Sequence, residues 1–156
     1  MSALLLRCTA LDLMICRLEA PDRAAVVSAM AKRLAEVDPQ IDAEHIERVA
    51  LAREEIESTG IGERVALPHA RTDGVQSTRL CICTLADPVE WQAYDERPVE
   101  AVFMILGSRR APAQQLRVLA DVSGLVRQPS FVDQLVAASD AAAMHAVLRS
   151  ASTRQG

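Results

Sequence analysis

Residues 99–106 read VEAVFMIL, and this nearly continuous apolar run decides the fold class of the chain. A strand that is apolar at almost every position has both faces buried, which is typical of the centre of a sheet covered by helices. The run therefore predicts a central strand, and the rest of the chain should supply the neighbouring strands and the covering helices.

Three further segments are predicted to be strands. Residues 79–85 read RLCICTL and residues 13–18 read LMICRL, and both are apolar runs of strand length. Residues 65–67 (VAL) form a shorter run that Pro68 stops, because proline has no backbone N–H to donate to a sheet. We expect these segments to lie in the same sheet as the central strand.

Helical patterns occupy much of the remaining chain. Apolar residues recur at helical spacing after Asp22 and after Asp42, and both aspartates are candidate N-caps. Further helices are expected after Pro112 and Pro129, and Asp140 is a candidate cap for the last helix. The sequence therefore predicts an α/β fold, a three-layer domain with a central mixed sheet and helices on both faces.

The charge balance excludes some classes of partner. The chain has 17 basic and 21 acidic residues, and Lys32 is its only lysine, which argues against nucleic-acid binding and against a polybasic membrane anchor. No apolar run approaches the roughly 20 residues that span a bilayer. The N-terminal segment, interrupted by Arg7, Asp12 and Arg17, is a poor signal peptide. We expect one domain over residues 1–156, located in the cytoplasm without membrane insertion.

The cysteines are interpreted as parts of the core. Cys81 and Cys83 are two residues apart, which places both on one face of a strand and does not match a C-x-x-C motif. We interpret these two, together with Cys8 and Cys16, as small buried or half-buried hydrophobic residues. A zinc site is the alternative, and it would need more ligands than this spacing offers. No metal and no cofactor are expected.

His69 is the histidine in the most informative position. His45 and His145 lie inside helical patterns beside the apolar positions, whereas His69 follows Pro68 in a glycine-containing segment between predicted elements. An imidazole held there could act as a nucleophile, a base or a metal ligand, although a purely structural histidine is the alternative.

Arg53 is predicted to face inward. It falls on the stripe formed by Ile46, Val49 and Ile56, and charged residues rarely face inward without a partner. One interpretation is an ion pair with Glu57, one helical turn further on. The other is an anion site, because a guanidinium offers a planar fork of donors that suits phosphate.

Residues 58–62 (STGIG) complete the candidate site. Two hydroxyl groups and two glycines in five residues are typical of a tight turn whose backbone N–H groups can approach a ligand closely. The same composition also simply ends helices, so this segment alone does not assign a function.

Residues 53–70 read REEIESTGIGERVALPHA, and this stretch resembles the signature of the fructose/mannitol/nitrogen-regulatory class of IIA components of the bacterial phosphotransferase system. A second stretch, which begins with PVEW at residues 88–91 and runs to Leu106, is similar to the same family. A third is QLRVLA at residues 115–120. The resemblance covers roughly residues 10–150.

The resemblance implies a mechanism and a set of partners. A histidine-containing phosphocarrier protein would donate a phosphoryl group to His69, and a IIB domain or a regulated protein would be the target. Arg53 would stabilise the charge of the phosphate, and Ser58 and Thr59 would orient or hydrogen-bond the site. The protein would then be a phosphohistidine carrier rather than a turnover enzyme.

Two positions depart from the family pattern. The second active-site histidine of the family falls on Gln115, which is neutral and cannot shuttle a proton, so we expect slow phosphorylation. The alternative is that Gln115 is only a residue of a helix surface. A glycine common in the family falls on Arg64, which could obstruct a docking partner or help to bind an anion.

Three functions remain open at this point. The first is a phosphoryl-accepting IIA-like protein, regulatory rather than sugar-transporting because the sequence shows no IIB- or IIC-like segment. The second is a non-catalytic protein-binding module of the same fold with impaired phosphotransfer. The third is a histidine-based hydrolase or small metalloenzyme, which would need a second base or ligand near His69.

Overall fold

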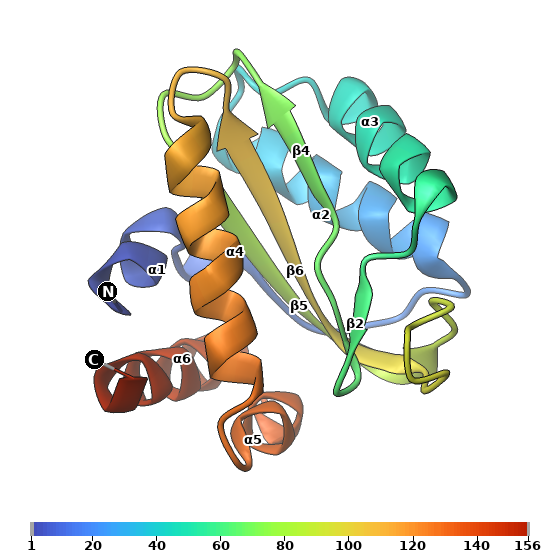
Figure 1. Cartoon of the computed structure of the whole chain (residues 1–156), viewed down its shortest axis with the longest axis vertical. Helices are drawn as coiled ribbons and strands as arrows, with labels where there is room; N and C mark the ends of the chain where they lie inside the picture. The colour runs from blue at the N-terminus through green and yellow to red at the C-terminus, as the bar shows by residue number, and fades with distance from the viewer. Residues whose placement is uncertain (1, 156) are drawn as a thin grey trace.

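The structure is a computed structural model that describes residues 2–155. Figure 1 shows strands β2 to β6 following one another along the chain, with helices before and after them. In chain order the elements are α1 (Ser2–Cys8), the 3-10 helix η1 (Leu11–Leu13), β1 (Met14–Leu18), α2 (Arg23–Val37), α3 (Ala43–Ile56), β2 (Gly60–Gly62), β3 (Val65–Ala66), β4 (His69–Thr72), β5 (Arg79–Val89), β6 (Val99–Ser108), α4 (Pro112–Val126), α5 (Phe131–Ala137) and α6 (Ala141–Gln155).

Strand β6 is the centre of a mixed sheet, as its apolar sequence predicts. It pairs with β5 in antiparallel orientation on one side, and with both β3 and β4 in parallel orientation on the other. The sheet continues outward through β1, parallel to β5, and through β2, antiparallel to β3. Every residue of β6 except Glu100 is buried, because helices cover both faces of the sheet.

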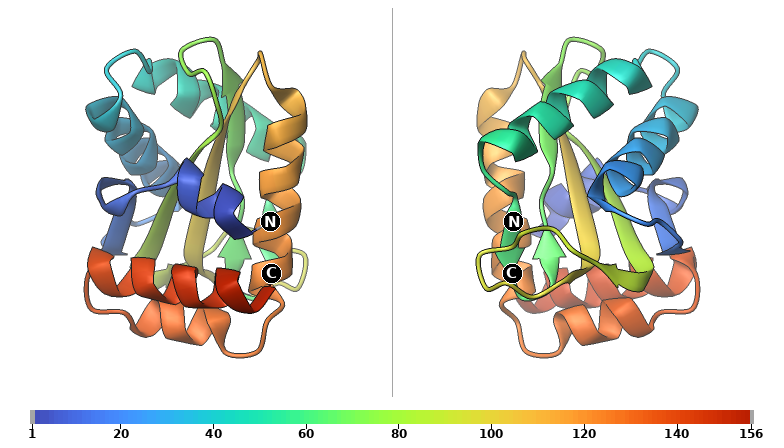
Figure 2. Two further views of the ribbon diagram at one scale, coloured as in Figure 1. Left: turned by 90° about the vertical axis from the view of Figure 1, so that its left-hand side faces the viewer. Right: turned by 90° about the vertical axis from the view of Figure 1, so that its right-hand side faces the viewer.

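The helices form the two outer layers. Helices α2 and α3 pack on one face, where their apolar side chains meet Cys81, Cys83 and Met104. Helices α1, α4, α5 and α6 cover the other face, where Leu80 and Phe103 are buried. Figure 2 shows the two groups of helices on opposite sides of the sheet. The prediction of a three-layer α/β fold is confirmed. Within residues 2–155, no helix combines the length and the hydrophobicity needed to cross a bilayer.

The helix starts expected from the sequence are also confirmed. The side chain of Asp22 accepts from the N–H of Ala25 at 2.9 Å, and the side chain of Asp42 accepts from the N–H of His45 at 3.2 Å. Asp140 likewise caps α6, and Pro112 begins α4. These caps fix where each helix begins and therefore which of its residues face the sheet.

The inward stripe of α3 differs from the one expected. The buried residues are Ile46, Ala50 and Glu54, each four positions from the next, whereas Ile56 is 82% exposed. Arg53 lies beside this stripe, at the boundary between the helix and solvent. Ile46 is buried as expected, but the structure buries Glu54 in place of Arg53 and Ile56, because a buried glutamate was not considered as a member of the stripe.

The segment 58–62 is not a tight turn. Residues 60–62 form strand β2, and the chain reverses at Glu63 and Arg64, which both have positive φ angles, of 56° and 65°. Gly60 serves close packing, because a Cβ atom there would lie 2.8 Å from the Cα atom of Ala93. The glycine therefore lets the hairpin lie against the loop that follows β5.

Candidate functional site

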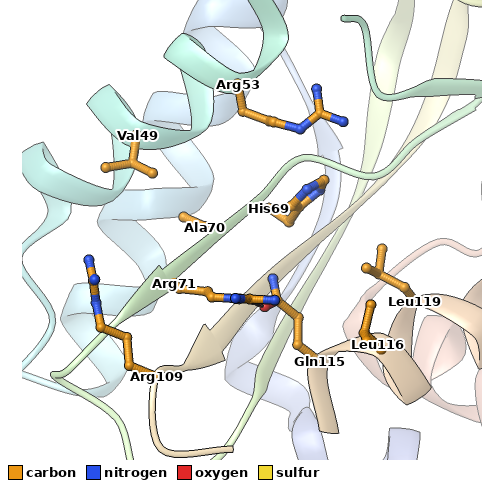
Figure 3. Close-up of a pocket in the computed structure, with 9 residues that line it drawn as sticks. All are labelled: Val49, Arg53, His69, Ala70, Arg71, Arg109, Gln115, Leu116 and Leu119. Carbon is orange, nitrogen blue, oxygen red and sulfur yellow. Dashed lines mark hydrogen bonds between the residues drawn. The ribbon is translucent and has the colours of Figure 1, made fainter. Parts of the chain in front are cut away.

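A pocket of about 370 Å³ opens between α3, β4, the end of β6 and the start of α4. We call it the His69 pocket; Figure 3 shows its lining side chains. They are Val49 and Arg53 from α3; His69, Ala70 and Arg71 from β4; Arg109; and Gln115, Leu116 and Leu119 from α4. Three of these nine residues are arginines and none is acidic, in a chain of net charge −4. The pocket is therefore suited to an anion.

His69 is held by the backbone on both sides of Pro68. It is the first residue of β4, a strand that the sequence did not predict, and the carbonyl of Pro68 accepts from the N–H of Ile105 at 3.0 Å. The Nδ1 atom of His69 lies 3.0 Å from the carbonyl oxygen of Leu67. A carbonyl can only accept, so Nδ1 carries the hydrogen and the neutral ring keeps its lone pair on Nε2.

Arg53 makes no ion pair with Glu57. Its Nη1 atom donates instead to the backbone carbonyl of Glu57 at 3.0 Å. No carboxylate among the described residues lies within ion-pair distance of this guanidinium. The ion-pair alternative is therefore wrong, and Arg53 brings an uncompensated positive charge to the lining of the pocket.

Gln115 is a buried residue, so the alternative of a helix-surface position is wrong. Its side chain is 2% exposed, and its Oε1 atom accepts from Nε of Arg71 at 2.6 Å. It also lies against Gly107, where a Cβ atom would be 2.5 Å from the same oxygen. Glycine at 107 therefore makes the room that the Gln115 side chain occupies.

Arg71 and Arg109 were missed from the sequence. His69 and Arg71 are two residues apart on β4, and alternate residues of a strand share a face. Recognition of residues 69–72 as a strand would therefore have placed Arg71 beside His69. Arg109, just after β6, forms an ion pair with Asp73 at 3.8 Å, and both side chains are largely exposed.

Ser58 and Thr59 do not line the His69 pocket. The hydroxyl of Ser58 donates to the carbonyl of Trp91 at 2.8 Å, and both the N–H and the hydroxyl of Thr59 donate to the carboxylate of Glu54. The carbonyl of Thr59 accepts from the N–H of Leu67 at 3.0 Å. These residues are therefore connected to His69 through the backbone, by way of Leu67.

Glu54 is a further residue that sequence reasoning missed. Its side chain is almost fully buried and accepts from Thr59 and, at 3.1 Å, from the indole N–H of Trp91. Arg23 lies at the edge of ion-pair distance, 4.0 Å. A buried carboxylate surrounded by donors fixes the end of α3, the start of β2 and the Trp91 loop relative to one another.

Arg64 lies outside the His69 pocket, at the β2–β3 turn. It forms ion pairs with Glu100 at 3.0 Å and with Asp133 at 2.6 Å, and so ties the turn to β6 and α5. Burial alone would lower the pKa of Arg64, but the hydrogen bonds to these two carboxylates raise the pKa overall. Arg64 therefore already has its anionic partners within the chain.

The cysteines are core residues, as expected. Cys8, Cys81 and Cys83 are buried, Cys16 is half-buried, and all four are free thiols. Burial raises the pKa of Cys81 to about 12 and raises the pKa of Cys83 as well. Such thiols are protonated near neutral pH and therefore pack as small hydrophobic side chains.

Comparison with known proteins identifies relatives of similar sequence. A nitrogen regulatory protein of Pseudomonas aeruginosa is 31% identical over 123 residues, which are 79% of this chain and 80% of that protein. A nitrogen regulatory protein of Bradyrhizobium diazoefficiens is 29% identical over 131 residues, 84% of this chain and 85% of that protein.

Solved structures agree with these relatives. The nitrogen regulatory protein IIA-Ntr of Neisseria meningitidis has a TM-score of 0.84 at 26% identity, covering 91% of this chain and 97% of that one. IIA mannitol of Escherichia coli shares the fold, with a TM-score of 0.76 at 16% identity over 89% of this chain and 97% of that one. The family model for the phosphoenolpyruvate-dependent sugar phosphotransferase system, EIIA 2, matches residues 9–151, so the chain belongs to this family.

Proposed function

We propose that this protein accepts a phosphoryl group on Nε2 of His69, holds it in the His69 pocket and passes it on or signals with it. The observation that carries the proposal is the hydrogen bond between Nδ1 of His69 and the carbonyl of Leu67, in a pocket lined by three arginines. The bond assigns the free lone pair to Nε2, and the arginines match the charge of a phosphoryl group.

The transfer is a nucleophilic displacement at phosphorus. Nε2 of His69 attacks a phosphohistidine brought by a carrier protein; a new P–N bond forms while the P–N bond to the donor breaks. The donor ring leaves with the electron pair of that bond, and nothing is oxidised or reduced. The proton on Nδ1 stays on the ring, because the carbonyl of Leu67 accepts a hydrogen bond from it and stabilises the positive charge that the ring acquires.

The remaining site residues divide into two roles in this proposal. Arg53 has N–H donors beyond the one bonded to Glu57 and contacts the phosphoryl oxygens. Ser58 and Thr59 do not touch the phosphate; they fix the backbone that carries Leu67, and through it the orientation of the His69 ring. Gln115 contacts the phosphate from α4.

In this proposal the protein belongs to the regulatory branch of the family. The two relatives that the match covers to 80% and 85% of their length are nitrogen regulatory proteins, with identities of 31% and 29%. A fold neighbour, the mannitol IIA enzyme of Escherichia coli, is known in complex with a phosphorylated IIB enzyme. We therefore propose a phosphocarrier protein as donor and either a regulated protein or a IIB domain as target, all in the cytoplasm.

The direct test is reconstitution of phosphotransfer. The protein is incubated with phosphoenolpyruvate, the first enzyme of the system and its phosphocarrier, and its intact mass is followed with time. The proposal expects a mass increase of one phosphoryl group that disappears in His69→Ala. Absence of any increase in the wild type, with the carrier fully phosphorylated, would contradict the proposal and favour a protein-binding module that does not accept phosphate.

A further inference from the structure

The side chain of Gln115 depends on a hydrogen-bond partner, Arg71. It is buried among the residues of the His69 pocket, and a buried amide needs partners for both its oxygen and its nitrogen. The oxygen accepts from Nε of Arg71 at 2.6 Å, a short bond from a charged donor. The arrangement is possible because Gly107 has no side chain at this point of β6.

This hydrogen bond fixes which end of the Gln115 amide faces the pocket. Because the guanidinium of Arg71 can only donate, it must meet the amide oxygen, and the amide N–H groups are left to face the pocket. Figure 3 shows the amide nitrogen of Gln115 on the side of His69 and the oxygen against Arg71. The opposite orientation would present an acceptor to an incoming anion and repel it.

The same bond fixes the guanidinium of Arg71. Its Nε–H is engaged by Gln115, which leaves the two terminal nitrogens for another acceptor. His69 and Arg71 pair with Ile105 and Gly107 of β6, so the two side chains leave the sheet on the same face. The side chain of Arg71 is exposed, so an arriving phosphoryl donor can reach it.

The other pocket arginines are less suited to this place. Arg109 already has a carboxylate partner in Asp73, and Arg53 approaches from α3, on the opposite wall of the pocket. Among the described residues Arg71 has no carboxylate within ion-pair distance. Its charge is therefore available to an anion that enters beside His69.

We propose that Arg71 is a phosphate-binding residue for the group on His69, and that Gln115 positions it while donating its own amide N–H to the same phosphate. Arg71 supplies the positive charge and Gln115 supplies the hydrogen bond, whereas a single protonated histidine at position 115 would supply both. This inference rests on the proposed phosphorylation of His69. It assigns the phosphate two guanidinium groups, Arg53 and Arg71, from opposite sides of the pocket.

The test compares transfer rates from the phosphorylated carrier in variants matched for charge. Arg71→Gln is expected to slow transfer about tenfold. Arg71→Lys should recover part of the loss because it keeps the positive charge. The recovery should be incomplete, because an ammonium group lacks the planar set of donors that contacts Gln115 and phosphate together. Arg110→Gln removes the same charge from an exposed residue outside the pocket and should transfer at the wild-type rate. Equal slowing by Arg71→Gln and Arg110→Gln, or no slowing by either, would overturn the proposal.

The positioning role of Gln115 is tested by a double-mutant cycle. Gln115→Met keeps the length of the side chain and removes its polar atoms. It should slow transfer about as much as Arg71→Gln, and the double variant should be no slower than the slower single variant. Effects that multiply in the double variant would show that the two residues act independently. Thermal unfolding of each variant shows whether slowing follows from loss of structure.

A second readout separates this inference from the proposed function. Inorganic phosphate is titrated into the unphosphorylated protein while the nitrogen shifts of the His69 imidazole are followed by NMR. Arg71→Gln should weaken the response several-fold, and Arg110→Gln should leave it unchanged. If the wild type takes no label from the carrier, the phosphotransfer proposal fails, and the titration alone decides the role of Arg71. An equal response in Arg71→Gln and wild type would exclude Arg71 from phosphate binding.

Discussion

The Nδ1 atom of His69 lies 3.0 Å from the carbonyl oxygen of Leu67, two residues earlier in the chain. The backbone of Leu67 is fixed in turn, because its N–H donates to the carbonyl of Thr59. The tautomer of the histidine and the direction of its ring are thus set by main-chain atoms, which side-chain substitutions around the pocket leave in place. Each surrounding side chain can therefore be replaced without changing the tautomer of His69, and its effect on transfer can be measured separately.

The first prediction concerns the site of attachment. His69→Ala should remove all phosphoryl label and leave the fold intact, because the ring is only half-buried. His45→Ala and His145→Ala, at half-buried positions of α3 and α6 outside the His69 pocket, are the controls and should be labelled normally. The label should be acid-labile and stable in base, as expected for a phosphoimidazole. Label that persists in His69→Ala would end this assignment.

The second prediction concerns Arg53. Arg53→Lys should slow transfer about tenfold, roughly 1.4 kcal/mol in the activation free energy, because lysine keeps the charge but loses the planar fork. The melting temperature should change little, since the guanidinium makes one hydrogen bond in a largely exposed setting, to the carbonyl of Glu57. A variant that transfers normally but melts lower would show that Arg53 is only structural.

The third prediction concerns Glu54. Glu54→Gln should lower the free energy of unfolding by about 1–3 kcal/mol. The carboxylate accepts from Thr59 and Trp91 with two oxygens, whereas the amide has only one oxygen. Its NH2 group would be buried against other donors. Glu55→Gln changes the neighbouring residue, which is 81% exposed, and should stay within about 0.5 kcal/mol of the wild type. Denaturant unfolding followed by the fluorescence of Trp91 measures both. Equal stabilities would contradict the anchoring role of Glu54.

The fourth prediction concerns alkaline pH. Burial raises the pKa of Cys81 from 9.0 to about 12, so above pH 9 the unfolded chain loses a proton that the folded chain keeps. The folded state binds more protons there, and stability must fall as pH rises. The loss should reach about 1.4 kcal/mol near pH 10 from this thiol. Cys81→Ala should flatten the dependence of unfolding free energy on pH, and an unchanged slope would contradict it.

The helices and the central strand could be predicted from the sequence because the signals that form them lie within a few residues of one another. The apolar run at β6, the caps Asp22 and Asp42, and the prolines at helix starts each act within a few residues, and the structure confirms all of them. The sequence motif likewise predicted that His69 and Arg53 belong to one site, and both line the same pocket.

The rest of the site depends on contacts that no local pattern contains. The strand β4 is only four residues long, and without it Arg71 could not be placed beside His69. The burial of Gln115 depends on Gly107, which reaches it from a different element. Glu54 is buried because Trp91, far along the chain, supplies a donor. Ser58 was expected at the site, but its hydroxyl donates to the carbonyl of Trp91, a residue distant in sequence that no local pattern connects with it.

The last prediction joins Gln115 to Arg71. Replacing Gln115 by histidine should change the transfer rate by less than about threefold in the wild type. The new imidazole would have to accept from Nε of Arg71, and a neighbouring cation disfavours the charged form of the ring, so the histidine would stay neutral. A neutral ring offers one N–H to phosphate, which is what the Gln115 amide already offers.

The outcome should differ when Arg71 is removed first. In an Arg71→Gln background the imidazole at position 115 is free to be protonated and to meet the phosphate as a cation, which restores the missing charge. Gln115→His should then raise the rate several-fold, on the order of 1 kcal/mol, because hydrogen bonds to charged groups exceed neutral ones by about that amount. The rate should also fall as pH rises above the imidazole pKa, a dependence absent from the Arg71→Gln parent. Equal gains in both backgrounds would show that Arg71 and residue 115 do not share one role.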